Sequence, residues 1–107
     1  MNRTISPDEL RRLLATRKNV LLLDVRRRTD YDTDGQKIPG AAWLDPDRLA
    51  QWSTALPLDR QIVVYCARGG TVSNSIVDQL QAKGIKACFI EGGIEAWRQA
   101  GGTTVGK

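Results

Sequence analysis

The sequence predicts an α/β fold built around a mostly parallel β-sheet, because short apolar runs alternate along the chain with segments of helical periodicity. The runs at 20–25 and 62–65 are almost wholly apolar, which is typical of strands buried on both faces. At 107 residues the chain has the size of one domain. We therefore expect a single α/β domain over residues 1–107, with an ordered core spanning about 4–101.

A helix is predicted near the beginning of the chain. Ser6 is a favourable N-cap, Pro7 suits the first helical position, and Glu9 lies where it can complete a capping box. Leucines then recur at helical spacing, so the helix should end near residues 18–19. The run 20–25 follows it as the first buried strand.

The middle of the chain carries a long polar segment and three further short elements. Residues 26–40 are polar and rich in turn residues, which indicates a connecting segment. A short strand is expected at 41–44, and a short helix at 46–52 with Asp45 as its cap. The run 62–65 is the next buried strand.

The last third of the chain continues the alternation of helix and strand. Apolar residues at helical spacing predict a helix from 72 to about 83, with Gly84 as its C-terminal stop. The apolar run 87–90 is expected to be a strand. Two glycines then lead into a short helix through Trp97.

The charge of the chain bears on its partners and its location. A net charge of +4 favours anionic partners. The densest basic cluster, Arg26-Arg27-Arg28, lacks the interleaved aromatic residues of a single-strand binder. We interpret it as a solvated basic face and expect no nucleic-acid partner. Because no apolar run approaches the roughly 20 residues of a membrane span and the first residues are unlike a secretory signal, we expect a cytoplasmic protein without a membrane partner.

The chain contains no histidine and two cysteines, Cys66 and Cys88. The lack of histidine excludes a Ser-His-Asp triad, a Cys-His protease and a histidine-ligated metal site. Two cysteines without clustered partners do not make a zinc site, so we expect no metal and no cofactor. A disulfide between them remains open, although a cytoplasmic chain does not need one.

Cys66 is the strongest candidate for a functional residue. It lies at the end of a predicted buried strand, and ligands of open α/β sheets bind beyond the carboxyl ends of the strands. Gly69 and Gly70 accept positive φ, so the N–H groups of the loop and of the following helix can point toward one spot. Such a loop binds an anion and stabilises the thiolate, which is the nucleophilic form. We therefore predict Cys66 as a catalytic nucleophile.

The predicted substrate-binding residues are the six that follow the nucleophile: Ala67, Arg68, Gly69, Gly70, Thr71 and Val72. Thr71 is expected to be the N-cap of the helix. Two placements of Arg68 remain open, one in the pocket mouth holding an anionic substrate and one on a solvent-exposed basic rim.

Each cysteine also has a purely structural interpretation. Cys66 can be a buried apolar residue that closes a strand, although the strand–cysteine–glycine loop–helix context favours function. Cys88 lies inside an apolar run, and core packing is its favoured role.

Five motifs, taken together and in order, resemble the rhodanese domain over most of the chain. They are Leu23-Asp24-Val25-Arg26, Asp30-Tyr31, Ile38-Pro39-Gly40-Ala41, Tyr65-Cys66-Ala67-Arg68-Gly69-Gly70-Thr71, and Glu91-Gly92-Gly93 with Trp97. The resemblance implies a three-layer α/β/α rhodanese fold with a five-stranded, mostly parallel sheet flanked by helices on both faces.

The resemblance also implies a thiosulfate sulfurtransferase activity. Cys66 would take a sulfane sulfur from a small anionic donor such as thiosulfate, hold it as a persulfide, and pass it to a thiol or cyanide acceptor. A protein that accepts sulfur stays open as a further partner. Transfer in two steps through a covalent intermediate is what a nucleophilic cysteine permits. A cation at Arg68, then glycine and Thr71, resembles the loop of the thiosulfate-using branch.

The chain departs from the family pattern at two positions. Lys37 stands where the family usually has histidine, at a position that is usually structural. Thr71 stands where many members have arginine.

Two other functions compete with sulfur transfer as interpretations of the sequence. A cysteine-based phosphatase needs an arginine six residues after the cysteine, and this chain has Val72 there. A sulfur-carrier, binding or regulatory module with little turnover is the alternative from a different class.

Several motif residues are expected to be structural. Asp24 and Arg26 should form an ion pair that organises the fold, and Glu91 and Trp97 should have structural roles. The glycines at 92–93 should allow a close approach of backbone beside the loop.

Overall fold

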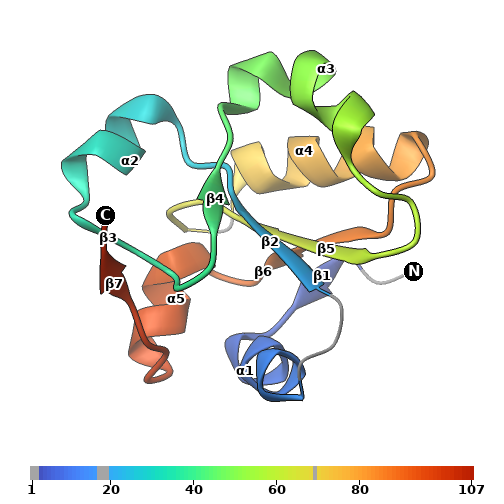
Figure 1. Ribbon diagram of the computed structural model, residues 1–107. Helices are drawn as coiled ribbons and strands as arrows, with labels where there is room; N and C mark the ends of the chain where they lie inside the picture. Colours follow the sequence, from blue (N-terminus) through green and yellow to red (C-terminus); the bar gives the residue numbers. More distant parts are fainter. Residues whose placement is uncertain (1–2, 17–19, 69) are drawn as a thin grey trace.

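A computed structural model of the chain describes residues 3–16, 20–68 and 70–107. Its main strands are β1 Thr4–Ile5, β2 Val20–Asp24, β4 Ala42–Trp43, β5 Gln61–Tyr65 and β6 Ala87–Ile90. They form one parallel sheet in the order β1-β6-β5-β2-β4 (Figure 1). β2 pairs with β5 along its whole length, with Asp24 opposite Tyr65, so the two strands end side by side.

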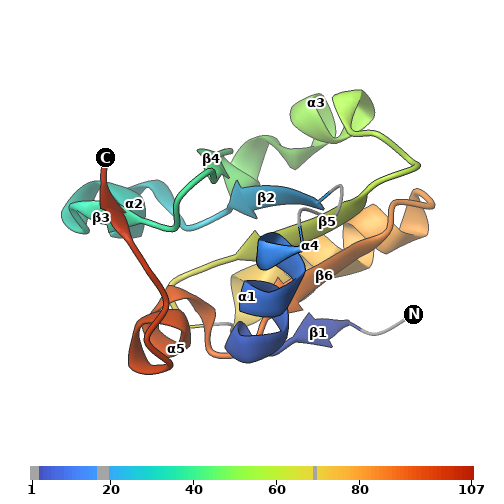
Figure 2. The same cartoon turned by 60° about the horizontal axis from the view of Figure 1, so that its bottom comes forward.

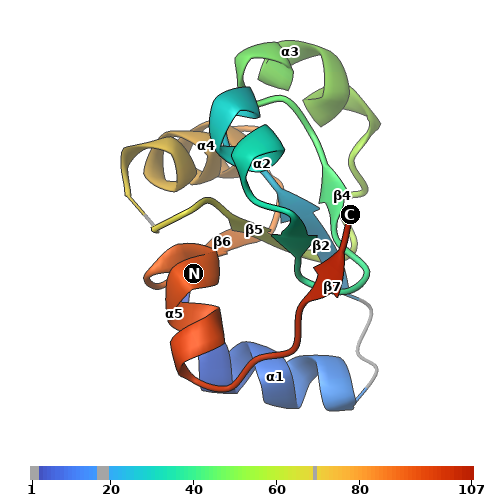
Figure 3. The ribbon, with the colours of Figure 1, turned by 90° about the vertical axis from the view of Figure 1, so that its left-hand side faces the viewer.

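Helices cover both faces of this sheet. They are α1 Pro7–Ala15, α2 Arg28–Thr33, α3 Leu49–Trp52, α4 Thr71–Ala82 and α5 Gly93–Gln99. Figures 2 and 3 show α1 and α5 on one face and α3 and α4 on the other. The predicted three-layer α/β/α fold with a five-stranded parallel sheet is therefore confirmed. A small antiparallel pair, β3 Gln36–Lys37 with β7 Val105–Gly106, lies beside α2.

The alternation of side chains along β5 divides the core in two. Val63 and Tyr65 belong to the cluster that packs under α1 and α5. Ile62 and Val64 belong to the cluster that packs under α3 and α4. Because successive side chains of a strand point to opposite faces, a strand covered on both faces has to be apolar throughout. This is the physical reason for the apolar runs in the sequence.

The predicted start of α1 is confirmed, and its end is earlier than expected. Ser6 Oγ accepts a hydrogen bond from the Glu9 amide at 3.1 Å, and Glu9 Oε1 accepts from the Ser6 amide at 3.1 Å. This is the predicted capping box. The helix ends at Ala15 with Thr16 as its C-cap. The expected end near residues 18–19 lies outside the described residues.

Several short elements were not predicted from the sequence, namely the strands β1, β3 and β7, the helix α2 and a 3₁₀ turn at Ser53–Ala55. The two-residue strand β1 pairs with β6 and completes the sheet, but it is too short to show a periodic pattern. Helix α2 occupies part of the segment 26–40 that was expected to be a connection. It buries none of its residues, so it has no apolar stripe by which periodicity could reveal it.

The remaining predicted elements are present with shifted bounds. The strand expected at 41–44 is shortened to β4. The helix expected at 46–52 is divided into a 3₁₀ turn at 46–48 and α3, and Asp45 caps the turn by accepting from the Asp47 amide at 2.9 Å. Gly84 has a φ of 80°, as expected for a helix stop.

Candidate active site

Cys66 lies directly after β5, at a pocket of about 410 Å³. The pocket is lined by Arg27, Asp30, Cys66, Ala67, Arg68, Gly70, Thr71 and Val72. The structure thus brings together every predicted site residue that it describes. The predicted residue Gly69 lies outside the described residues. The Cys66 residue is 6% exposed, so it is held at the edge of the core rather than on the open surface.

Helix α5 positions the loop that follows Cys66 through two backbone hydrogen bonds. The Ile94 amide donates to the Cys66 carbonyl at 3.0 Å, and the Glu95 amide donates to the Ala67 carbonyl at 3.2 Å. In a trans peptide the N–H points opposite to the C=O, so the amides of Ala67 and Arg68 point away from α5. None of the described pocket-lining residues belongs to α5; the other walls come from the β2–α2 junction and from α4. Two backbone donors are therefore oriented toward the space beside Cys66.

Gly93 makes this close contact between α5 and the Cys66 loop possible. Its φ is 64°, and a Cβ atom there would overlap the Cys66 carbonyl oxygen and lie 2.7 Å from the Ala67 carbonyl carbon. Only glycine fits both the left-handed backbone and the contact. The expected close approach of backbone beside the loop is confirmed at this position.

Gly93→Ala is expected to displace the loop and to lower the free energy of unfolding by about 1–3 kcal/mol, because both backbone strain and overlap oppose the methyl group. Chemical denaturation measures the stability, and the rate of Cys66 alkylation by iodoacetamide reports the loop. Gly106→Ala is the matched control, because a Cβ at Gly106 meets nothing within 4 Å. Equal behaviour of the two variants would show that α5 does not position the loop.

The start of α4 differs in detail from the prediction. Thr71 is the first residue of the helix, and Gly70 is its N-cap, with its carbonyl accepting from the Asn74 amide at 3.2 Å. Gly70 has a φ of −100°, so it does not use the positive φ expected of it. Because glycine has no side chain to cap the helix, the first-turn amides of α4 stay available at the pocket. Thr71 and Val72 of that turn line it.

Arg68 lies on the rim of the pocket. Its side chain is 85% exposed, and its Nε atom is 3.1 Å from Oε2 of Glu95. Of the two placements that the sequence left open, this one corresponds to the solvent-exposed rim. Glu95 offsets part of the charge that Arg68 could offer to an anion.

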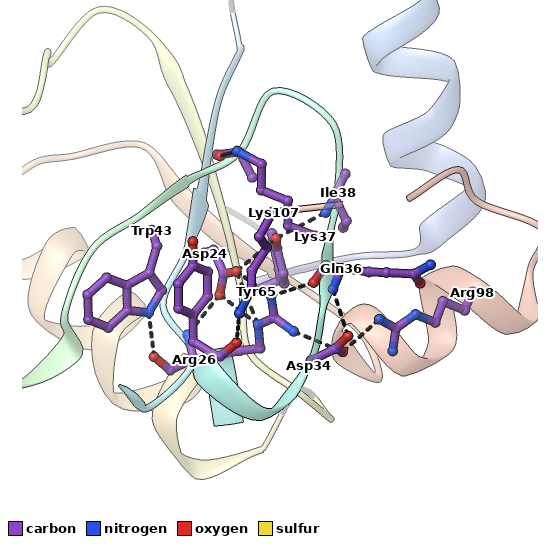
Figure 4. Close-up of polar contacts among 12 residues, drawn as sticks. Asp24, Arg26, Asp34, Gln36, Lys37, Ile38, Trp43, Tyr65, Arg98 and Lys107 are labelled. Atoms are coloured by element: carbon purple, nitrogen blue, oxygen red, sulfur yellow. Dashed lines mark hydrogen bonds and ion pairs between the residues drawn. The ribbon is translucent and has the colours of Figure 1, made fainter. Parts of the chain in front are cut away.

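Asp24 and Arg26 form a buried ion pair at the end of β2 (Figure 4). Asp24 is 0% and Arg26 1% exposed, and Arg26 Nη2 donates to Asp24 Oδ2 at 2.7 Å. Tyr65 donates its hydroxyl to the same carboxylate at 3.1 Å. Burial alone would lower the pKa of the Arg26 guanidinium, but the hydrogen bonds and charge of Asp24 raise it. Arg26 and Asp24 therefore form the expected ion pair, which anchors the end of β2.

Other motif residues have contacts that fit structural roles. Lys37 donates to the Ala41 carbonyl at 2.9 Å, so the residue that replaces the usual histidine ties the ends of its own loop. Glu91 accepts from Thr4 Oγ1 at 2.9 Å, and the buried Trp97 donates to the Thr103 carbonyl at 2.8 Å. Cys88 is 4% exposed, and burial raises the pKa of its thiol. Neither cysteine forms a disulfide.

Two pocket residues were missed by the sequence analysis. Arg27 was assigned to a solvated basic face, and Asp30 was used only as part of a motif. The Val25 amide donates to the Tyr65 carbonyl at 2.8 Å, which brings the residues after β2 alongside Cys66. The signal that could have found them is the pairing of two adjacent parallel strands, whose carboxyl ends meet at one edge.

Two kinds of feature are absent from the described residues. These residues contain no cluster of three or more His, Cys, Asp or Glu side chains that could hold a metal ion. None of their helices is long and apolar enough to cross a membrane.

Comparison with known proteins identifies the family. Residues 6–100 match the family model of the rhodanese-like domain. The chain belongs to the rhodanese-like domain family. Its fold and motif order agree with this membership.

Related rhodanese-like proteins include named sulfurtransferases. The chain is 35% identical over 98 residues to the probable adenylyltransferase/sulfurtransferase MoeZ of Mycobacterium tuberculosis, covering 88% of this chain but only 24% of MoeZ. It is 27% identical over 86 residues to the thiosulfate sulfurtransferase GlpE of Coxiella burnetii, covering 79% of this chain and 78% of GlpE. The rhodanese-like domain of the Anabaena protein Alr3790 superposes with a TM-score of 0.84 at 28% identity, covering 100% of this chain and 81% of that one.

Proposed function

We propose that this rhodanese-like domain is a sulfurtransferase in which Cys66 carries a sulfane sulfur as a persulfide. The observation that carries the proposal is the position of the Cys66 thiol in a pocket toward which backbone amides of its own loop are turned. A nucleophile beside an anion-binding backbone fits an anionic sulfur donor. The relatives named as sulfurtransferases support this reaction class.

Thiosulfate is the donor that we propose. The Cys66 thiolate attacks the outer sulfur of thiosulfate, a new S–S bond forms, and the original S–S bond breaks with its electron pair leaving on sulfite. The products, a Cys66 persulfide anion and sulfite, carry the same total charge as the thiolate and thiosulfate. The likeness to GlpE, named as a thiosulfate sulfurtransferase, favours this donor.

The acceptor completes the cycle. A thiolate attacks the outer sulfur of the persulfide, takes it as a new persulfide, and restores the Cys66 thiolate. Cyanide attacks the same sulfur atom and departs as thiocyanate, which also restores the Cys66 thiolate. The open pocket edge near Arg68 gives an acceptor access to Cys66. A protein thiol is the larger acceptor that we include in this proposal, and a cytoplasmic location, where thiols stay reduced, is part of it.

The competing functions have less support. A cysteine-based phosphatase uses an arginine fork to hold the phosphoryl oxygens, and the sixth residue after Cys66 is Val72, an uncharged residue at the pocket wall. A binding module without turnover would have no use for a thiol placed beside oriented amides.

Intact mass spectrometry tests the proposal directly. After incubation with thiosulfate and removal of the excess, the protein should gain one sulfur atom, and peptide mapping should place it on Cys66. The gain should disappear on addition of cyanide, with release of thiocyanate. A protein that gains no sulfur, or gains it on Cys88, would contradict the proposal.

A further inference from the structure

The three consecutive arginines after β2 have three different environments. Arg26 is buried against Asp24. Arg28 is 73% exposed, and its Nε atom is 3.4 Å from Oδ2 of Asp32. Arg27 lines the pocket of Cys66 and also an adjoining pocket of about 210 Å³ beside the first turn of α4. Of these three arginines, only Arg27 therefore reaches the candidate site.

The backbone holds Arg27 in place on both sides. Trp43 Nε1 donates to the Arg26 carbonyl at 2.8 Å, and the Tyr31 amide donates to the Arg27 carbonyl at 2.9 Å. Arg26 is fixed to the interior by its carboxylate partner, and Arg27 is the N-cap residue of α2. When the backbone of a binding residue is already fixed, less conformational entropy is lost as that residue binds a ligand.

The charges around Cys66 leave Arg27 as the available cation. Arg68 is paired with Glu95 on the rim. Within the residues described, no carboxylate lies within ion-pairing distance of Arg27, and no acceptor is hydrogen-bonded to its guanidinium. Asp30, also a pocket residue, adds a negative charge that a dianionic donor has to overcome. A cation that lines the same pocket offsets this repulsion.

We propose that Arg27, rather than Arg68, recognises the charge of the sulfur donor. This inference rests on the proposed sulfurtransferase function and names the residue that selects its anionic substrate. The guanidinium offers several N–H donors in a planar fork that suits the oxygens of a sulfonate group. With the sulfonate of thiosulfate between Arg27 and the first turn of α4, the outer sulfur is directed to Cys66. The same contacts stabilise the charge that leaves on sulfite.

Steady-state kinetics with a matched set of variants tests the assignment. Arg27→Gln should lower kcat/KM for thiosulfate about tenfold, as expected for the loss of one charge-assisted contact. Arg27→Lys should lower kcat/KM less than Arg27→Gln does, because lysine keeps the positive charge but lacks the planar fork of donors. Arg28→Gln should stay within about twofold of the wild type, and Arg68→Gln should lose less than about threefold, an effect that moderate salt removes.

Two further measurements separate donor recognition from other effects. The rate at which an uncharged thiol removes sulfur from the isolated persulfide should be the same in Arg27→Gln and the wild type, because this step involves no sulfonate. Sulfate, an unreactive anion of similar shape, should slow alkylation of Cys66 by iodoacetamide in the wild type and in Arg28→Gln, but not in Arg27→Gln. The last assay needs no turnover.

The outcomes distinguish the two proposals. If the wild type never forms a persulfide with thiosulfate, the proposed function fails, and sulfate protection still decides whether Arg27 binds anions at this site. If the wild type turns over and Arg27→Gln matches it in both kcat/KM and sulfate protection, the assignment of Arg27 is overturned. A loss in Arg68→Gln that exceeds the loss in Arg27→Gln would overturn it as well.

Discussion

Cys66→Ser is expected to abolish sulfur transfer from thiosulfate to cyanide. A serine hydroxyl is a far weaker nucleophile than a thiolate and cannot hold the sulfane sulfur as a persulfide, so the covalent route is lost rather than slowed. Thiocyanate formation in the presence of thiosulfate measures the effect. We expect a rate equal to that of the reaction without protein.

Cys88→Ala is the control for this experiment. Cys88 lies within β6, is 4% exposed, and receives a contact from Gln61 Nε2 at 3.6 Å, so its replacement removes buried volume without touching the pocket. This variant should retain turnover and lose some stability. Turnover that persists in Cys66→Ser, or disappears in Cys88→Ala with the fold intact, would mean that Cys66 is not the sulfur carrier.

Arg26→Met is expected to lower the free energy of unfolding by about 3–5 kcal/mol. The cost arises because the Asp24 carboxylate, 0% exposed, is left without its charged partner. Asp34 and the Gln36 carbonyl also lose hydrogen bonds from Arg26, at 3.1 Å and 3.0 Å. Urea denaturation measures the change, which is a large part of the stability of a typical domain.

A matched variant and a double variant make this prediction specific. Arg28→Met changes the same residue type two positions away, on the surface, and should cost less than about 0.5 kcal/mol. Asp24→Asn combined with Arg26→Met should cost at least about 1 kcal/mol less than the sum of the single changes, since the second change removes the unpaired charge. Strict additivity would show that the two side chains do not stabilise each other.

Local signals in the sequence determined the framework of this protein. The capping box of Ser6 and Glu9, the apolar runs that become β2, β5 and β6, and the stop at Gly84 all act within a few residues, so periodicity and capping rules find them. The position of Cys66 after a buried strand and before a helix was visible for the same reason. The sequence thereby determined both the fold class and the candidate nucleophile.

Contacts between distant segments were decided only by the tertiary structure. β1 is a strand because β6 lies beside it, and α2 buries no side chain that a pattern could show. Gly93 contacts the Cys66 loop although it lies 27 residues further along the chain, and no local rule predicts such a contact.

The three arginines at 26–28 show most clearly the difference between what the sequence and what the tertiary structure determined. Three identical residues in succession carry the same local information, yet Arg26 is buried, Arg27 lines the pocket and Arg28 is exposed to solvent. Their environments depend on Asp24 in the interior, Cys66 at the end of the neighbouring strand, and the turn of backbone that begins α2. Burial and charge pairing are properties of the folded arrangement, so the sequence determined the candidate nucleophile, and the fold decided which arginine lines its pocket.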